Sequence, residues 1–159
     1  MDRHRRLRQR GISLIEILVV MVVAAILFAS TMPSWDDRQI IGANARTLVS
    51  DAVRARSYAQ RIWDTVTMDI EVENDRWRLV EQDSGAWVDG PGADDQGWRH
   101  LDKYTHFQAV PGVSEDFVFL PNGRCAAEGE VWITSGDQVW RIRVNPLSGT
   151  IEAEPVNQP

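Results

Sequence analysis

Residues 11–33, GISLIEILVVMVVAAILFASTMP, decide how this chain is organised. From Ile12 to Met32 the stretch holds 21 residues, and Glu16 is the only charged one. A helix of that length is about 31 Å long, about the thickness of the hydrocarbon core of a bilayer. Five arginines crowd the residues before the stretch, so the positive-inside rule places residues 1–11 in the cytoplasm and the chain after Pro33 outside. The pattern predicts a single-pass membrane helix.

Two features separate this stretch from an ordinary secretory signal. Its apolar run exceeds the 7–15 residues of a signal peptide, and no small-residue cleavage site follows it. A carboxylate inside a membrane helix costs about 2.5–3.5 kcal/mol on insertion scales, so Glu16 is interpreted as a functional group with a partner.

At these residues the sequence resembles the class III signal of type IV pilins and type II secretion pseudopilins. The resemblance implies that a prepilin peptidase cleaves between Gly11 and Ile12 and that Ile12 is then N-methylated. It also implies that Glu16 compensates the new α-amino group of a neighbouring subunit as helices pack in a filament. Pro33 lies 33 − 11 = 22 residues into the mature chain, where such pilins commonly carry a helix-kinking proline. The alternative is an uncleaved membrane anchor with an accidental glutamate.

The composition predicts one folded domain after the anchor. About 125 residues from Ser34 onward can bury a core, and 43% of the chain is hydrophobic. Without residues 1–11 the chain keeps 17 − 5 = 12 basic and 23 − 1 = 22 acidic side chains, a net charge of −10. Such an acidic domain disfavours nucleic-acid binding. Cys125 is the only cysteine, which excludes an internal disulfide and is interpreted as a buried apolar side chain.

Periodicity predicts an α+β fold, with one long helix followed by antiparallel strands. Residues 34–62 carry an apolar stripe at helical spacing, formed by Ile41, Leu48, Ala52, Ala55, Ala59 and Ile62. The small alanines would let a β-sheet approach the helix closely. From Thr65 the period changes to two, so residues 63–159 are predicted to form a β-rich domain. The strands are expected at 66–72, 77–81, 117–120, 131–133, 139–144 and 150–153, with a loose tail at 155–159.

Residues 83–112 are predicted to be a long loop, because the part up to residue 102 is rich in glycine and aspartate. Trp87 and Trp98 interrupt it, and we expect them to pin the loop on the domain or on a neighbouring subunit. They are the candidate residues for subunit contact. Asp89, Asp94 and Asp95 could offer oxygen ligands to calcium, but their spacing fits no EF-hand, so a solvated acidic loop is preferred.

Later segments sharpen the resemblance to one group of pilin-like proteins. The helix LVSDAVRARSYAQR at 48–61, the turn at 119–123 and the segment RIRVNPLSG at 141–149 look like the GspH/FimT group of minor pseudopilins and pilins. Each motif alone says little more than strand and turn, and their order carries the weight. The resemblance implies a pilin-like fold whose long helix packs on antiparallel sheet.

No motif indicates catalysis. His100 and His106 have no motif-spaced Ser, Cys or Glu partner, and two histidines without cysteine neighbours are a poor zinc site. The sequence therefore predicts a non-enzymatic protein without a cofactor or metal.

These observations favour a minor pseudopilin of the GspH type in a type II secretion system. The expected partners are homologous pilin or pseudopilin subunits, the prepilin peptidase and the inner membrane, with the C-terminal domain in the periplasm. One alternative is a minor type IV pilin of the FimT/FimU type that primes pilus assembly. A DNA-uptake pilin is less favoured, because the chain ends with Glu152 and Glu154 instead of a basic stretch.

Overall fold

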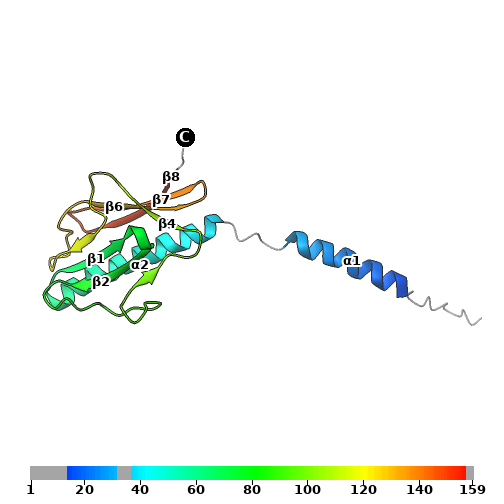
Figure 1. The fold of residues 1–159 in the computed structure, drawn as a ribbon, viewed down its shortest axis with the longest axis horizontal. Helices are drawn as coiled ribbons and strands as arrows, with labels where there is room; N and C mark the ends of the chain where they lie inside the picture. Colours follow the sequence, from blue (N-terminus) through cyan, green and yellow to red (C-terminus); the bar gives the residue numbers. More distant parts are fainter. Residues whose placement is uncertain (1–13, 32–36, 157–159) are drawn as a thin grey trace, which may run out of the picture. The chain divides into compact units, whose positions relative to one another are not determined.

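The computed structural model describes residues 14–31 and 37–156. The chain divides into two compact units, residues 1–34 and residues 35–159. The first contains the helix α1, Leu14–Thr31, whose sequence has neither glycine nor proline. The second begins with the helix α2, Asp37–Ile62, and continues through eight strands (Figure 1).

Helix α2 forms where the sequence predicts it. Five of the six residues of its predicted apolar stripe are fully buried, and Ala45 extends the stripe by one position. Four of the buried positions are alanines, whose small side chains allow close packing against the sheets. Helix α2 ends at Ile62, and Trp63 then adopts a left-handed conformation with φ 59°. A residue in the left-handed conformation commonly ends a helix, and in most proteins this residue is a glycine.

Two four-stranded antiparallel sheets pack against α2 (Figure 1). The first has the order β3-β2-β1-β5, and the second has the order β4-β6-β7-β8. The strands of the first sheet are β1 Val66–Glu71, β2 Arg76–Glu81, β3 Arg99–His100 and β5 Phe117–Phe119. The strands of the second sheet are β4 His106–Ala109, β6 Gly129–Ser135, β7 Gln138–Val144 and β8 Ile151–Val156.

Both hairpins that the sequence predicts from alternating side chains and turn residues are present. β1 pairs with β2 from Val66↔Glu81 to Glu71↔Arg76, and β6 pairs with β7 from Gly129↔Val144 to Ser135↔Gln138. The predicted first strand is one residue too long, because Val72–Asn74 form a 3-10 turn. Asp75 closes that turn in a left-handed conformation with φ 51°.

The segment 83–112 is more ordered than its composition predicts. It contains β3, which pairs with β2, and β4, which pairs with β6 from His106↔Thr134 to Ala109↔Val131. Among the four residues of β4 only Phe107 is buried, so the segment shows no clear alternation of its own. The last strand is longer than the predicted 150–153, because β8 runs through Pro155 to Val156, two residues that the sequence assigned to the loose tail.

The core lies between α2 and both sheets. Its largest fully buried side chains come from every layer and include Trp77, Phe117, Phe119 and Leu48. The ring of Trp77 meets the ring of Phe107 edge-on, with the centroids 6.0 Å apart. Cys125 is 4% exposed and packs in this core, as the sequence predicts.

Candidate assembly site

Helix α1 is apolar on all sides and carries one charge. Among its 18 residues, Glu16 is the only ionisable side chain, and it lies in the first turn. A carboxylate is favoured there, because unpaired backbone N–H groups give the start of a helix a positive partial charge. Large apolar side chains are exposed along the helix, for example Leu14 at 82% and Met21 at 70%. A helix of this composition is stable only when other apolar groups surround it.

The other predicted processing and assembly residues, Gly11, Ile12 and Pro33, lie outside the described residues. Within residues 14–31 and 37–156, no helix is both long enough and apolar enough to cross a membrane.

A buried carboxylate fixes α2 on the domain. Asp51 is 3% exposed, and its Oδ2 accepts hydrogen bonds from Trp77 Nε1 of β2 at 2.9 Å and from an Arg99 guanidinium nitrogen of β3 at 2.6 Å. Arg54, one helical turn further along α2, lies 3.4 Å from the other oxygen. One aspartate thus joins the helix to two strands of the first sheet. Asp51 does not belong to the predicted apolar stripe, and no signal in the sequence indicates this contact.

A second polar contact joins α2 to the segment before β4. Asn44 Nδ2 donates to Thr105 Oγ1 at 2.9 Å, and both residues are buried. Nearby, Asp75 accepts the backbone N–H of Phe107 at 2.7 Å and lies 2.6 Å from His106 Nδ1. These contacts hold β4 against the β1–β2 turn, which explains why a segment without alternation is ordered.

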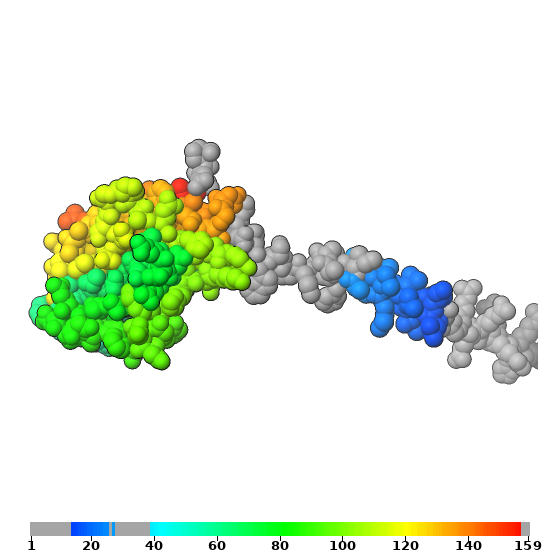
Figure 2. Space-filling view, in the orientation of Figure 1, coloured from blue at the N-terminus to red at the C-terminus, as the bar shows by residue number. Residues whose placement is uncertain are grey.

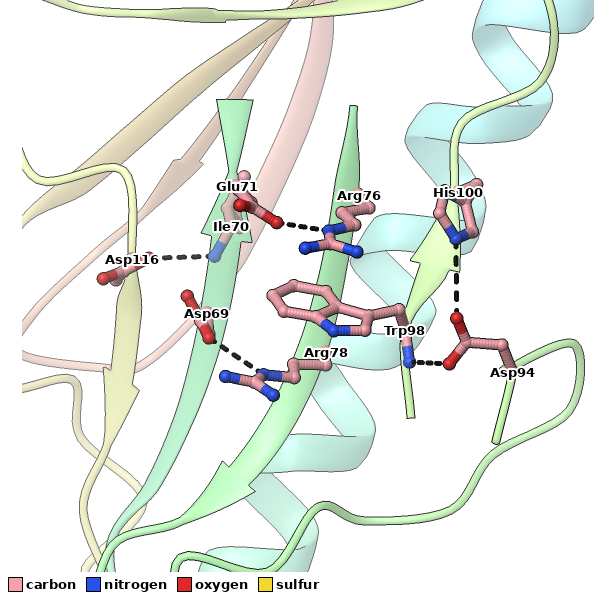
Figure 3. Close-up of polar contacts among 9 residues, drawn as sticks. All are labelled: Asp69, Ile70, Glu71, Arg76, Arg78, Asp94, Trp98, His100 and Asp116. Atoms are coloured by element: carbon pink, nitrogen blue, oxygen red, sulfur yellow. Dashed lines mark hydrogen bonds and ion pairs between the residues drawn. The ribbon is translucent and has the colours of Figure 1, made fainter. Parts of the chain in front are cut away.

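Trp98 lies between two arginines on the first sheet (Figure 3). The guanidinium carbons of Arg76 and Arg78 are 4.1 Å and 4.2 Å from the centroid of its ring. Residues two apart in a strand share a face, so β2 presents both arginines on one side with room for a ring between them. On β1, Glu71 pairs with Arg76, and Asp69 accepts from Arg78 Nε at 3.0 Å. Five side chains thus form one ladder on the face of the sheet, with the Trp98 ring between two paired arginines: Asp69, Glu71, Arg76, Arg78 and Trp98.

In this ladder Trp98 packs within its own domain. The side chain is 6% exposed and contacts its own domain, which is one of the two roles that the sequence left open. Trp87 remains 47% exposed, although one side of it lies against the backbone of Gly97. The signal that could have located Trp98 is the Arg-x-Arg spacing in a predicted strand, because such a pair can hold one aromatic ring.

Asp94 holds the loop just before Trp98 in place through hydrogen bonds. Its Oδ1 accepts the backbone N–H groups of Gln96 at 2.9 Å and of Trp98 at 2.8 Å, and its Oδ2 lies 3.7 Å from His100 Nε2 (Figure 3). Desolvation alone would raise the pKa of Asp94, but these N–H donors and His100 outweigh it and lower the pKa below its usual range. Both oxygens of this calcium candidate therefore have partners within the protein.

Within residues 14–31 and 37–156, no group of three or more His, Cys, Asp or Glu side chains is placed to hold a metal ion. Asp89 and Asp95, the other two calcium candidates, are exposed in the loop.

Beside the ladder, Asp116 continues the edge of β1. Its Oδ1 accepts the backbone N–H of Ile70 at 2.9 Å, two residues beyond the last pair of β1 and β5 (Figure 3). Burial raises the pKa of Asp116, and the nearby carboxylate of Asp69 adds to the increase, although the Ile70 N–H opposes it. The side chain therefore acts as a cap for the strand ladder.

The three most exposed large hydrophobic side chains among the described residues of the domain lie in three different segments. Trp63 is 77% exposed at the end of α2, Tyr104 is 65% exposed before β4, and Leu147 is 75% exposed in the turn between β7 and β8. In Figure 2 the lower part of the visible face of the domain is green, around β1 and β2, and the upper part runs from yellow-green to orange, where later segments of the domain lie. Sequence analysis did not single out Trp63 as an exposed residue.

Comparison with known proteins agrees with both parts of this description. Residues 6–32 match the model of the prokaryotic N-terminal methylation motif. No curated protein sequence shows significant similarity to the chain.

Solved structures match the domain. The minor pseudopilin EpsH from the type 2 secretion system of Vibrio cholerae aligns with a TM-score of 0.56 and 14% identity, over 73% of this chain and 97% of that chain. The type IV minor pilin FimU of Pseudomonas aeruginosa aligns with a TM-score of 0.55 and 19% identity, over 75% of this chain and 91% of that chain. At this identity the likeness establishes the fold.

The helix α2 packed on antiparallel sheets is thus the pilin-like fold of these proteins, and a methylation motif precedes it in the sequence. The chain is a pilin-like protein that is similar to the GspH/FimT group of minor pseudopilins and minor pilins.

Proposed function

We propose that this protein is a minor pseudopilin, a non-enzymatic subunit of the filament of a type II secretion system. The observation that carries the proposal is a methylation motif at 6–32 that contains an apolar helix with one carboxylate and is followed by a pilin-like domain. The partners would be homologous subunits, because a helix that is apolar on all sides needs other apolar helices or lipid around it.

The mechanism assigns a role to each N-terminal residue. Before assembly, residues 12–33 would lie in the inner membrane with the domain in the periplasm. A prepilin peptidase would cut between Gly11 and Ile12, and methylation of Ile12 would follow. Glu16 would then pair with the new amino group of an adjacent subunit, which lowers the cost of keeping a carboxylate among apolar helices.

The change Glu16→Ala tests this mechanism. Because the carboxylate lies outside the cleavage site, we expect the variant to be processed normally but to enter filaments poorly. Immunoblots of sheared filament fractions and of membranes measure the two steps separately. Glu73→Ala removes an exposed glutamate of the domain and is the matched control. Normal incorporation of the Glu16→Ala protein would contradict the pairing role.

A second candidate is a minor type IV pilin, favoured by the alignment with FimU over 91% of that chain. Deletion of the gene separates the two, since loss of exoprotein secretion with intact twitching motility supports the pseudopilin. The reverse phenotype supports the minor pilin.

A further inference from the structure

The last strand of the second sheet leaves one edge without a partner. β8 pairs with β7 from Val144↔Ile151 to Val139↔Val156 and ends the order β4-β6-β7-β8. No strand in the described part of the chain pairs with its other edge. An edge strand presents unpaired backbone N–H and C=O groups, to which an extended segment of another protein can add.

Charges alternate in sign across the outer face of this sheet. In register, Glu130 of β6 lies opposite Arg143 of β7, and Arg143 lies opposite Glu152 of β8. The guanidinium of Arg143 donates to Glu152 at 3.2 Å. In the next row Arg141 donates to Glu154 through Nε at 3.0 Å. Both rows end at the β8 edge with an exposed glutamate, so a cation on an added strand would continue the alternation.

The inner face of the same edge opens on a groove between α2 and the sheet. The groove has a volume of about 470 Å³ and is lined by Arg46, Val49, Ser50, Trp140 and Ala153. Trp140 lies against Gly42 of α2, where a Cβ would come within 3.4 Å of its ring. Ala153 faces this side and has a short side chain, so an apolar side chain of an adjacent strand has space beside it.

A symmetric pairing of two β8 strands does not satisfy this pattern. In an antiparallel pair, opposite residues point to the same face, so a register that keeps the two outer faces together sets Glu152 or Glu154 against a glutamate of the other copy. Like charges directly opposite each other are destabilising. The edge therefore favours a basic partner over a second copy of itself.

We propose that β8 binds an extended segment of another protein as a fifth strand. This segment carries two basic residues with one apolar residue between them. The basic residues would lie opposite Glu152 and Glu154, and the apolar residue would enter the groove beside Ala153. Pro155 has no N–H group and limits the pairing to residues 151–154. The proposal does not depend on filament assembly, because every group involved belongs to the domain.

A synthetic peptide tests the charge pattern. The probe is acetyl-Thr-Val-Arg-Val-Arg-Val-Thr-amide with a fluorescent label, titrated with the full chain in an uncharged detergent and followed by anisotropy. We expect saturable binding, and binding about tenfold weaker after Glu152→Gln and Glu154→Gln together, since two cross-strand charge pairs are lost. The double variant Glu73→Gln with Asp95→Asn removes the same charge from exposed positions elsewhere and should bind as the original chain does. Equal weakening by both double variants would overturn the proposal.

Backbone methylation of the peptide tests strand addition without changing the protein. One peptide carries N-methyl groups on its arginines, and another carries them on its valines. In an added strand only alternate N–H groups face β8, so one peptide should lose binding and the other should retain it. Retention by both peptides would reduce the interaction to charge attraction and would overturn the proposal, as would a probe that does not bind.

Discussion

Removal of the ring of Trp98 is the sharpest test of how the loop is held. The side chain is 6% exposed, and substitution of a buried tryptophan by alanine costs about 3–5 kcal/mol. The two guanidinium contacts at 4.1 Å and 4.2 Å contribute about 2 kcal/mol of that cost, at about 1 kcal/mol each. Trp98→Leu keeps apolar volume but loses both contacts, so we expect the free energy of unfolding to fall by about 2–3 kcal/mol.

The assay is urea unfolding of the full chain in detergent, followed by circular dichroism. The two changes Arg76→Met and Arg78→Met complete a double-mutant cycle, in which the cost of Trp98→Leu should drop by about 2 kcal/mol. The ion pairs of these arginines with β1 cancel in the cycle, because they are lost in both arms. Trp87→Leu is the matched control in the same loop, and at 47% exposure it should cost about 1 kcal/mol or less. A coupling of about zero would refute the assignment of the arginines as the partners of the ring.

Three further predictions concern the domain. Asp51→Ala should lower the free energy of unfolding by about 3–5 kcal/mol, because it leaves Arg99, whose side chain is only 11% exposed, without its carboxylate; a cost of under about 1 kcal/mol in urea would contradict the contact. Gly149→Ala should lower the melting temperature more than Gly136→Ala, since both have positive φ but only at Gly149 would a Cβ lie 2.2 Å from a backbone oxygen; equal shifts would count against this packing. The pKa of Asp94 is lowered in the folded protein, so its contribution to stability is present above about pH 4 and is lost as the pH falls through the folded pKa. Melting temperatures between pH 6 and pH 3 should therefore fall less steeply in Asp94→Asn, and parallel curves would exclude the effect.

The sequence predicted those elements whose signal is local. The apolar stripe of α2 and the alternation of β1, β2, β6 and β7 follow from helical and strand periods, and each element is present with bounds that differ from the prediction by a few residues at most. The strand β4 could not be predicted in this way, because only one of its four residues is buried and its order depends on contacts to Asp75 and to β6.

The predicted sites also differ in whether their signal is local in the sequence. The methylation motif is a contiguous pattern and is matched at residues 6–32. The packing of Trp98 depends on Arg76 and Arg78, which are some 20 residues earlier in the chain and lie beside the ring because β3 pairs with β2. The roles of Glu16, Trp87, Gly11 and Ile12 in processing and assembly stay predictions.

The central claim is that the apolar helix with its single glutamate becomes a filament element once the arginine-rich segment is removed. Intact-mass measurement of the protein extracted from its native membranes tests this most directly. The account predicts a mass below the 18.0 kDa of the full chain by residues 1–11, increased by one methyl group on Ile12. A protein that keeps residues 1–11 and carries no methyl group on Ile12 would contradict it.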